Sequence, residues 1–274
     1  MTVAEAAPLS FVRRLHPETL RWLGGAAGAL ALHASLRALN ALVLILYGQY
    51  DLPALPVATW LSGLAAAVTL YTFGSYLRDR MTGVLLAGLW SVVPVISGHH
   101  ASLFTALAAG SLLAALRKNW LTAGVLCLLA GLTLPTGAAL TLVVVPVAVI
   151  ALVRDPREWR PWVATVLALA GLAGGLPQLG TGRLTVETGL LLLLAVALLV
   201  VAAGERLPRP LLVYAGGVVL IALAARQAQA LIPAFPLLLP IVYAIRRSHN
   251  RVVPFAVVGA LTVASAVLSV HLTA

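Results

Sequence analysis

Residues 189–203 read GLLLLLAVALLVVAA and contain no charged side chain. The apolar residues follow one another without the alternation of polar and apolar positions that a barrel strand shows. A segment that crosses lipid has to satisfy its own backbone hydrogen bonds, and a helix does so within the segment. The stretch therefore predicts an apolar helix, and similar runs rich in Leu, Ala and Val recur along the chain.

The composition of the whole chain indicates an all-α membrane protein. Of its 274 residues, 61% are hydrophobic and 9% are charged, whereas about a quarter of the residues of a soluble domain are charged. The net charge of +10 would suggest a nucleic-acid partner in a soluble protein. Here we assign the cations to the ends of membrane spans and expect no nucleic-acid partner. The single cysteine, Cys127, excludes a disulfide within the chain.

We predict a polytopic transmembrane helix bundle of about eleven spans, although several of the apolar runs are short for a full crossing. The predicted spans are residues 22–46, 55–77, 81–97, 101–116, 120–134, 137–153, 162–179, 186–203, 211–225, 231–245 and 252–271. Residues 1–21 are expected to form a cytoplasmic tail, and residues 22–274 a single multi-span membrane domain, because the loops are short and no linker interrupts them.

Basic side chains gather on one side of this predicted topology. They precede the first span or follow the second, fourth, sixth, eighth and tenth spans: Arg13, Arg14, Arg21, Arg78, Arg80, Arg117, Lys118, Arg154, Arg157, Arg160, Arg206, Arg209, Arg246, Arg247 and Arg251. The loops of the other side contain only Arg183 and Arg226. Cytoplasmic loops are enriched in Lys and Arg, so we expect a multi-pass protein of a bacterial plasma membrane, with the N-terminus in the cytoplasm.

Two sites on the predicted outer side carry residues with catalytic or ligand chemistry. Asp51 follows the first span, and a carboxylate there is a candidate general base; an Asp shortly before Pro53 is equally an ordinary turn residue. His99 and His100 follow the third span. Adjacent histidines on a helix diverge and no third ligand lies nearby, so we predict substrate contact or a solvated helix start and no metal site.

Charged and kinked segments supply the remaining candidates for substrate binding. Arg37 lies within the first span on one helix face with His33 and Asn40; it either binds a phosphate or sugar, or orients the helix through pairing or snorkelling. Arg226 and Gln229 precede residues 231–245, where three prolines predict a kinked helix that lines a cavity or merely bends.

Residues 97–137 read SGHHASLFTALAAGSLLAALRKNWLTAGVLCLLAGLTLPTG. The segment resembles the central part of the PIG-V-like mannosyltransferases of the GT-C class, in the Ser-Leu-Phe at 102–104, the basic turn with Trp at 117–120 and the Gly-Leu-Thr-Leu-Pro-Thr-Gly at 131–137. Residues 231–237, LIPAFPL, resemble a second signature of that family.

The resemblance implies a GT-C-like fold and a lipid-linked sugar donor, a polyprenyl-phosphate mannose. It implies inverting transfer to an extracytoplasmic acceptor, with Asp51 in the place of the family's catalytic acid. The chain departs from the family in its short first outer loop and in Leu134, where the family has an arginine. His100 and Ala101 stand where the family has a glutamate.

Three functions follow from these observations. The first is mannosyl transfer by this chain, with Asp51 as base and with Arg226 and Arg37 near the donor phosphate. The second is a non-catalytic homologue that binds a polyprenyl lipid or assists a partner glycosyltransferase subunit, because the departures remove polar groups and leave the apolar scaffold. The third is transport of a small solute or lipid, although intramembrane carboxylates are scarce and no internal repeat is evident.

Overall fold

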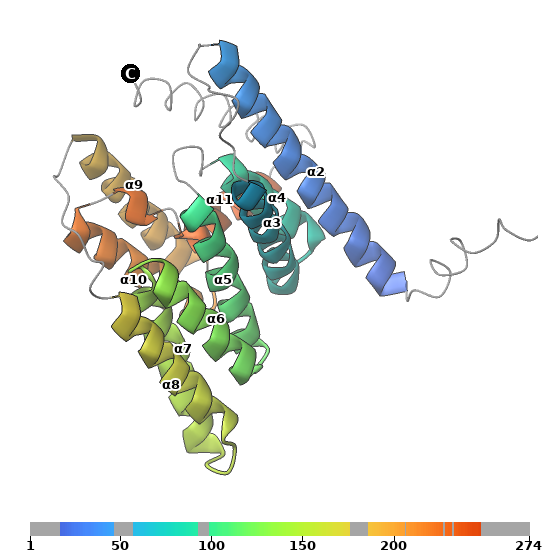
Figure 1. Cartoon of the computed structure of the whole chain (residues 1–274). Helices are drawn as coiled ribbons and strands as arrows, with labels where there is room; N and C mark the ends of the chain where they lie inside the picture. Colours follow the sequence, from blue (N-terminus) through green and yellow to red (C-terminus); the bar gives the residue numbers. More distant parts are fainter. Residues whose placement is uncertain are drawn as a thin grey trace, which may run out of the picture.

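The computed structural model of the chain describes residues 17–46, 57–92, 99–175, 186–205, 207–226, 228–231 and 233–247 (Figure 1). Every regular element in these ranges is a helix. The predicted all-α class is therefore confirmed for the part of the chain that the structure describes.

The helices coincide with the apolar runs of the sequence. They are α2 (Pro17–Leu46), α3 (Val57–Leu77), α4 (Arg80–Val92), α5 (His99–Leu116), α6 (Trp120–Thr133), α7 (Gly137–Arg154), α8 (Arg160–Gly175), α9 (Val186–Gly204) and α10 (Arg209–Ala225). Each corresponds to one of the first nine predicted spans, and α2 begins five residues before the predicted one. The last predicted span, residues 252–271, lies outside the described residues.

The segment after α10 does not form the single kinked helix that the sequence predicts. It consists of two short 3-10 helices, η4 (Ala228–Leu231) and η5 (Phe235–Leu238), followed by α11 (Leu239–Arg247). Pro233, Pro236 and Pro240 cause the break, because each lacks the N–H that an interior helical position donates. Proline is tolerated in the first turn of a helix, and Pro236 lies there in η5.

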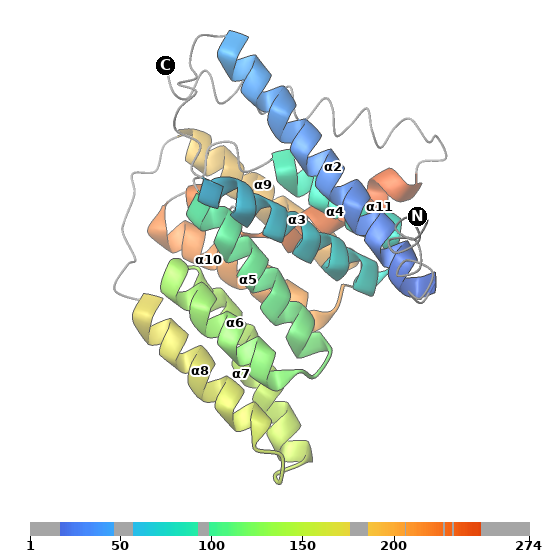
Figure 2. The same ribbon diagram turned by 45° about the vertical axis from the view of Figure 1, so that its right-hand side comes forward.

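Neighbouring helices pack side by side over most of the bundle. Figure 2 shows α5, α6 and α8 in sequence, with α2 lying across α3 and α4. The closest association is that of α6 with α8, while α7 contacts both α8 and α10. Because the turns that join α6 to α7 and α7 to α8 are short, each consecutive pair runs antiparallel, and α6 and α8 therefore run parallel.

Glycines allow three helices to approach backbone to backbone. A Cβ on Gly131 would lie 2.5 Å from the carbonyl oxygen of Gly171, and one on Gly137 would lie 2.5 Å from the Cα of Gly131. A Cβ on Gly124 would lie 2.7 Å from the Cα of Ala164. Small residues at such contacts are typical of packed membrane helices, so the Gly-rich turn at 131–137 has a structural role.

Among the described residues, α7 is the one helix that is both long enough and apolar enough to cross a membrane. The other apolar stretches contain 10–17 described residues each: Arg80–Val92, Ala101–Leu116, Trp120–Thr133, Gly189–Gly204 and Arg209–Ala225.

Candidate functional site

One end of the bundle is stabilised by a capping carboxylate. Asp79 precedes α4, and its Oδ1 accepts hydrogen bonds from the backbone N–H of Thr82 (2.9 Å) and from its hydroxyl (2.7 Å). The guanidinium of Arg246 pairs with the other carboxylate oxygen. Partial burial by itself would raise the pKa of Asp79, but the bonds from Thr82 and Arg246 together place that pKa below its usual value.

Three further arginine side chains contact residues of other segments at the same end of the bundle. Arg247 pairs with Glu205 at 2.7 Å, and the guanidinium of Arg78 lies 5.1 Å from the ring centroid of Tyr243. The guanidinium of Arg117 lies 5.0 Å from the ring of Tyr76 at the end of α3. We call this region, formed by the turns at 78–80 and 117–119, by residues 205 and 207–208 and by the end of α11, the basic end.

The start of α5, the turn at 134–136 and the end of α10 form the opposite end of the bundle. Helices α5 and α6 meet at the basic end through residues 117–119, and α10 begins there after Glu205, so their other ends lie away from it. At the opposite end the hydroxyls of Ser102 and Thr136 are buried and have no hydrogen-bond partner among the described residues. Thr136 precedes α7 as its N-cap residue, yet its side chain makes no capping bond.

The structure describes the sequence-predicted site residues only in part. Asp51 lies outside the described residues. Arg37 lies in α2, His99 and His100 begin α5, and Gln229 lies in η4, but their side chains are outside the described part of the chain. Arg226 ends α10 in a left-handed conformation, with φ of 54°, and its side chain is exposed. The contact of these residues with one another therefore stays a prediction.

His33, predicted to share a polar face with Arg37, is directed into the core of the bundle. Its Nδ1 lies 2.6 Å from the hydroxyl of Ser91 in α4, and its ring is stacked on Trp90 with centroids 6.2 Å apart. The Ser91 hydroxyl donates its single proton to the carbonyl of Ala87. Nδ1 of His33 must therefore be the donor to Ser91, which fixes the tautomer of the imidazole.

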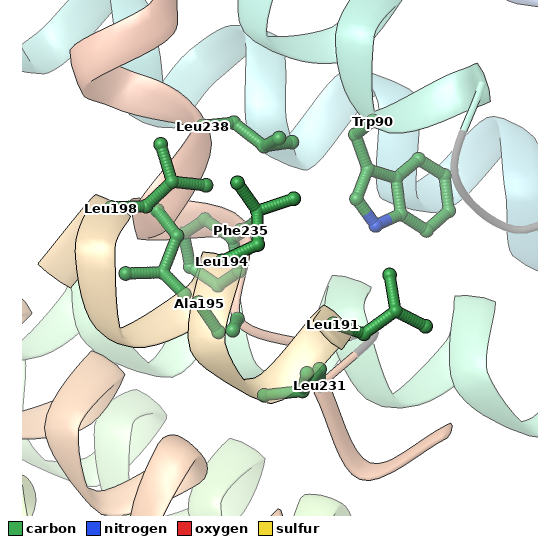
Figure 3. Close-up of a pocket in the computed structure, with 10 residues that line it drawn as sticks. Trp90, Leu191, Leu194, Ala195, Leu198, Leu231, Phe235 and Leu238 are labelled. Atoms are coloured by element: carbon green, nitrogen blue, oxygen red, sulfur yellow. The ribbon is translucent and has the colours of Figure 1, made fainter. Parts of the chain in front are cut away.

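An apolar cavity of about 180 Å³ lies beside Trp90, between α4, α9 and the segment 231–238. Figure 3 shows Leu194 and Phe235 across the cavity from the indole. Trp90 is fully buried, and its Nε1 has no hydrogen-bond partner in the described structure. The indole N–H is thus a hydrogen-bond donor left unused at the edge of an apolar space.

The residues that stand out in the structure were not singled out by sequence reasoning. Ser102 and Thr136 lie in the segments that resemble the mannosyltransferases, but their lack of partners depends on tertiary packing. Trp90 reads as one more aromatic residue in an apolar helix. Among the described residues no group of three or more His, Cys, Asp or Glu side chains is arranged to bind a metal ion.

Comparisons with protein-family models, with curated proteins and with solved structures found no match to this chain. Function is accordingly inferred from the residues and their arrangement.

Proposed function

We propose that this chain is a polytopic membrane protein of about eleven spans whose basic end lies in the cytoplasm. Large apolar side chains are exposed along several helices, including Val153 (77% exposed), Leu193 (69%) and Leu220 (66%). Monomeric soluble proteins rarely expose contiguous apolar patches of more than a few hundred Å². Lipid is the solvent that this surface fits.

The contacts at the basic end support the orientation. The sequence assigns the clusters at 78–80, 117–118, 206–209 and 246–247 to one side of the membrane because Lys and Arg prefer the cytoplasm. Arg246 reaches Asp79, Arg247 reaches Glu205 and Arg117 lies over Tyr76. Segments far apart in sequence thus meet at one end, as a shared cytoplasmic face requires.

Within this topology we propose a GT-C-like glycosyltransferase homologue that transfers a mannosyl group from a polyprenyl-phosphate sugar to an extracytoplasmic acceptor. The observation that carries the proposal is that two of the five buried side-chain groups without a hydrogen-bond partner among the described residues are the hydroxyls of Ser102 and Thr136. Both lie in the segments that resemble mannosyltransferases and both lie at the opposite end. A buried hydroxyl without a partner is costly, and a polar ligand such as a sugar would satisfy it.

The proposed reaction needs a base on the acceptor side and a cation on the donor side. Asp51 would take the proton of the acceptor hydroxyl. The oxygen of the acceptor then forms a bond to the anomeric carbon of the sugar. The bond from that carbon to the phosphate oxygen breaks, and the polyprenyl phosphate leaves with the electron pair, so the anomeric centre inverts. Arg226, exposed at the end of α10, and Arg37 in α2 would stabilise the phosphate charge.

A second function, that of a non-catalytic homologue that binds a polyprenyl lipid for a partner glycosyltransferase subunit, is favoured by Leu134. The family has an arginine at this place. Leu134 instead ends α6, its N–H bonded to the carbonyl of Ala130, and its side chain packs against the hydrophobic core. A residue built into the core in this way offers no charge to a donor phosphate.

Transfer by the purified protein in nanodiscs decides between these functions. The assay uses radiolabelled polyprenyl-phosphate mannose and membrane lipids as acceptors, and compares the wild type with Asp51→Asn and with Asp155→Asn, which lies exposed at the cytoplasmic turn after α7. An enzyme loses transfer by about 100-fold or more in Asp51→Asn and keeps it in Asp155→Asn. Full activity of Asp51→Asn contradicts Asp51 as base. Donor binding without any transfer supports the non-catalytic homologue.

A further inference from the structure

The turn between α7 and α8 carries three arginines that the described part of the chain does not pair. Arg154, Arg157 and Arg160 are exposed, and none of their guanidinium groups makes an ion pair or a ring contact with a described residue. Asp155 and Glu158 lie in the same turn, but the Asp155 carboxylate accepts from the backbone N–H of Arg157 at 3.2 Å. The two arginines of α11, by contrast, are both paired within the chain.

A second turn, residues 117–119, lies beside this one. Gly124 of α6 packs against Ala164 of α8, and each is the fifth residue of its helix. Because α6 and α8 run parallel, the two helices begin at the same level, and so do the turns that precede them. Lys118 is exposed and has no ion-pair partner among the described residues. We call Lys118 and the three arginines the turn cations.

The backbone of Lys118 has a conformation that is unusual for a lysine. Its φ is 58°, in the left-handed region that helix ends ordinarily reach with glycine. The N–H groups of Lys118 and Asn119 bond to the carbonyls of Ala115 and Ala114, and a glycine would make the same two bonds without the steric cost of a Cβ. A lysine at this position therefore indicates a use for the charged side chain.

The length of α7 sets the depth of the turn cations in a membrane. This helix is apolar enough to cross, and its 18 residues rise about 27 Å, close to the hydrocarbon thickness of about 30 Å. Arg154 is its last residue, so the turn that follows lies at the level of the lipid headgroups. Figure 2 shows this turn at the bottom of the bundle, past the turn between α5 and α6.

One exposed face of α8 leads from this level into the apolar layer. Trp159, Trp162, Val166 and Leu169 are all exposed and follow one another at intervals of three or four residues, so they lie on one side of the helix. We call these four residues the apolar stripe. Tryptophan is enriched where headgroups meet hydrocarbon, and two tryptophans begin the stripe. A ligand with an apolar chain can lie along it while its polar end reaches the turn cations.

We propose that the turn cations bind the phosphate of an anionic glycerophospholipid from the cytoplasmic leaflet, with one acyl chain along the apolar stripe. Charge complementarity selects this ligand, because residues 117–118 and 154–160 contain five cations and two carboxylates, and a zwitterionic lipid already carries a cation beside its phosphate. Inorganic phosphate would leave the apolar stripe without a partner. The site rests on the proposal that the chain spans a membrane with its basic end in the cytoplasm. It uses no residue of the transfer reaction.

Matched lipids and variants test this site. The full chain is purified, delipidated in detergent and titrated with phosphatidylglycerol or with phosphatidylcholine of the same acyl chains, and bound lipid is counted by native mass spectrometry. Arg160→Gln removes one turn cation, and Lys118→Gly removes another while relieving its left-handed backbone. Arg80→Gln is the matched control, because Arg80 is an exposed cation of a different turn at the basic end.

The wild type and Arg80→Gln should bind phosphatidylglycerol at least about tenfold more tightly than phosphatidylcholine. Arg160→Gln and Lys118→Gly should each lose about threefold to tenfold in affinity for phosphatidylglycerol, the effect of one cation beside an anionic lipid. Lys118→Gly should do so with a melting temperature that is unchanged or higher, because glycine suits the left-handed position. Loss of binding without loss of stability separates a lipid contact from a structural role.

Unchanged affinity for phosphatidylglycerol in either site variant overturns the proposal, as does an equal loss in Arg80→Gln. Displacement of the bound lipid by an excess of inorganic phosphate also overturns it, because the site would then be one for a free anion. A chain absent from the membrane fraction of cells would instead overturn the spanning proposal, so the two failures are distinguishable.

Discussion

The two ends of the bundle are stabilised by different interactions. At the basic end, side chains make the contacts: Asp79 caps α4 and pairs with Arg246, and Glu205 pairs with Arg247. At the opposite end, α6, α7 and α8 approach through glycine backbones at 131 and 171. The polar side chains there include hydroxyls that no described residue satisfies.

Buried polar groups without partners among the described residues nevertheless occur toward both ends of the bundle. The partners of Asp79 and Glu205 lie within the chain, but the buried hydroxyl of Ser75, near the end of α3, has no partner in the described structure. Ser102, Thr136 and the indole of Trp90 are buried donors without partners in the described structure. Buried polar groups are nearly always satisfied in native proteins. Ligand binding is expected at the opposite end because Ser102 and Thr136 lie there in the segment that resembles the mannosyltransferases, and the ion pairs of the basic end are expected to serve stability and orientation.

The largest expected effect comes from adding one methyl group to the glycine contact of the opposite end. In Gly131→Ala the new Cβ would lie 2.5 Å from the carbonyl oxygen of Gly171, and both atoms belong to backbones that cannot turn aside. Separating α6 from α8 should cost about 2–3 kcal/mol. Thermal unfolding of the purified protein in detergent, followed by tryptophan fluorescence, measures the loss.

The control for this variant is the same substitution where space is open. No atom lies within 4 Å of a Cβ built on Gly189 in α9, so Gly189→Ala should be neutral or stabilising by up to about 1 kcal/mol through helix propensity. Equal melting temperatures for Gly131→Ala and Gly189→Ala would refute the close contact of α6 with α8.

At the basic end, Asp79→Ala should lower the free energy of unfolding by about 1–2 kcal/mol, because it removes the cap of α4 and the pair with Arg246. Asp79→Asn keeps a capping oxygen and should lose less than 1 kcal/mol. The pKa of Asp79 is lowered in the folded state. Its contribution is therefore present above the unfolded pKa and is lost as the pH falls through the folded pKa.

Melting temperatures measured from pH 7 down to about pH 3 test this titration. The wild type should lose its advantage over Asp79→Asn in the acid range, below about pH 4. A difference between the two proteins that stays constant over the whole range would show that the carboxylate charge does not contribute.

Replacing Thr141 and Thr136 in turn by valine compares a hydroxyl that has a hydrogen-bond partner with one that has none among the described residues. Thr141 donates to the carbonyl of Ala168 at 3.1 Å, so Thr141→Val should cost about 1 kcal/mol. The hydroxyl of Thr136 has no partner in the part of the chain that the structure describes, so Thr136→Val should leave stability unchanged or raise it by up to about 1 kcal/mol, while sugar-donor binding falls. Chemical unfolding measures the change in stability, and donor titration measures the change in binding. If Thr136→Val is destabilised, the hydroxyl of Thr136 has a hydrogen-bond partner in the wild type.

The smallest effect is expected at the exposed ion pair of Arg247 with Glu205. The Arg247 side chain is 69% exposed, and pairs of this kind contribute about 0.2–1 kcal/mol. Glu205→Gln should therefore destabilise slightly at low ionic strength and not at all at 1 M salt, where the screening length is about 3 Å. A loss that persists in high salt would indicate packing by Glu205 rather than charge.

The sequence predicts the helices better than the site. Continuous apolar runs locate α2 to α10, and the grouping of cations predicts that the turns at 79 and 205 share an end, which the Arg246 and Arg247 pairs agree with. Three closely spaced prolines predict a disturbed helix after α10. The sequence does not show that this segment divides into η4, η5 and α11, or that the carbonyl of Pro233 accepts a hydrogen bond from the hydroxyl of Tyr214.

The site could not be predicted because its features arise from tertiary contacts. His33 and Ser91 are 58 residues apart, and only the packing of α2 on α4 joins them. The sequence likewise contains no sign that the hydroxyl of Thr136 lacks a partner or that Nε1 of Trp90 faces a cavity. Asp51 lies outside the described residues, so its role as base stays a prediction.

The membrane topology with the basic end in the cytoplasm is the claim on which the rest depends, and cysteine labelling in intact cells tests it most directly. The native thiol is removed by Cys127→Ala, and single cysteines are introduced by Arg157→Cys in the turn after α7 and by Arg226→Cys at the end of α10. A membrane-impermeant maleimide should label position 226 in intact bacteria and position 157 only after the cells are permeabilised. Labelling of both positions in intact cells, or of position 157 alone, would contradict the account.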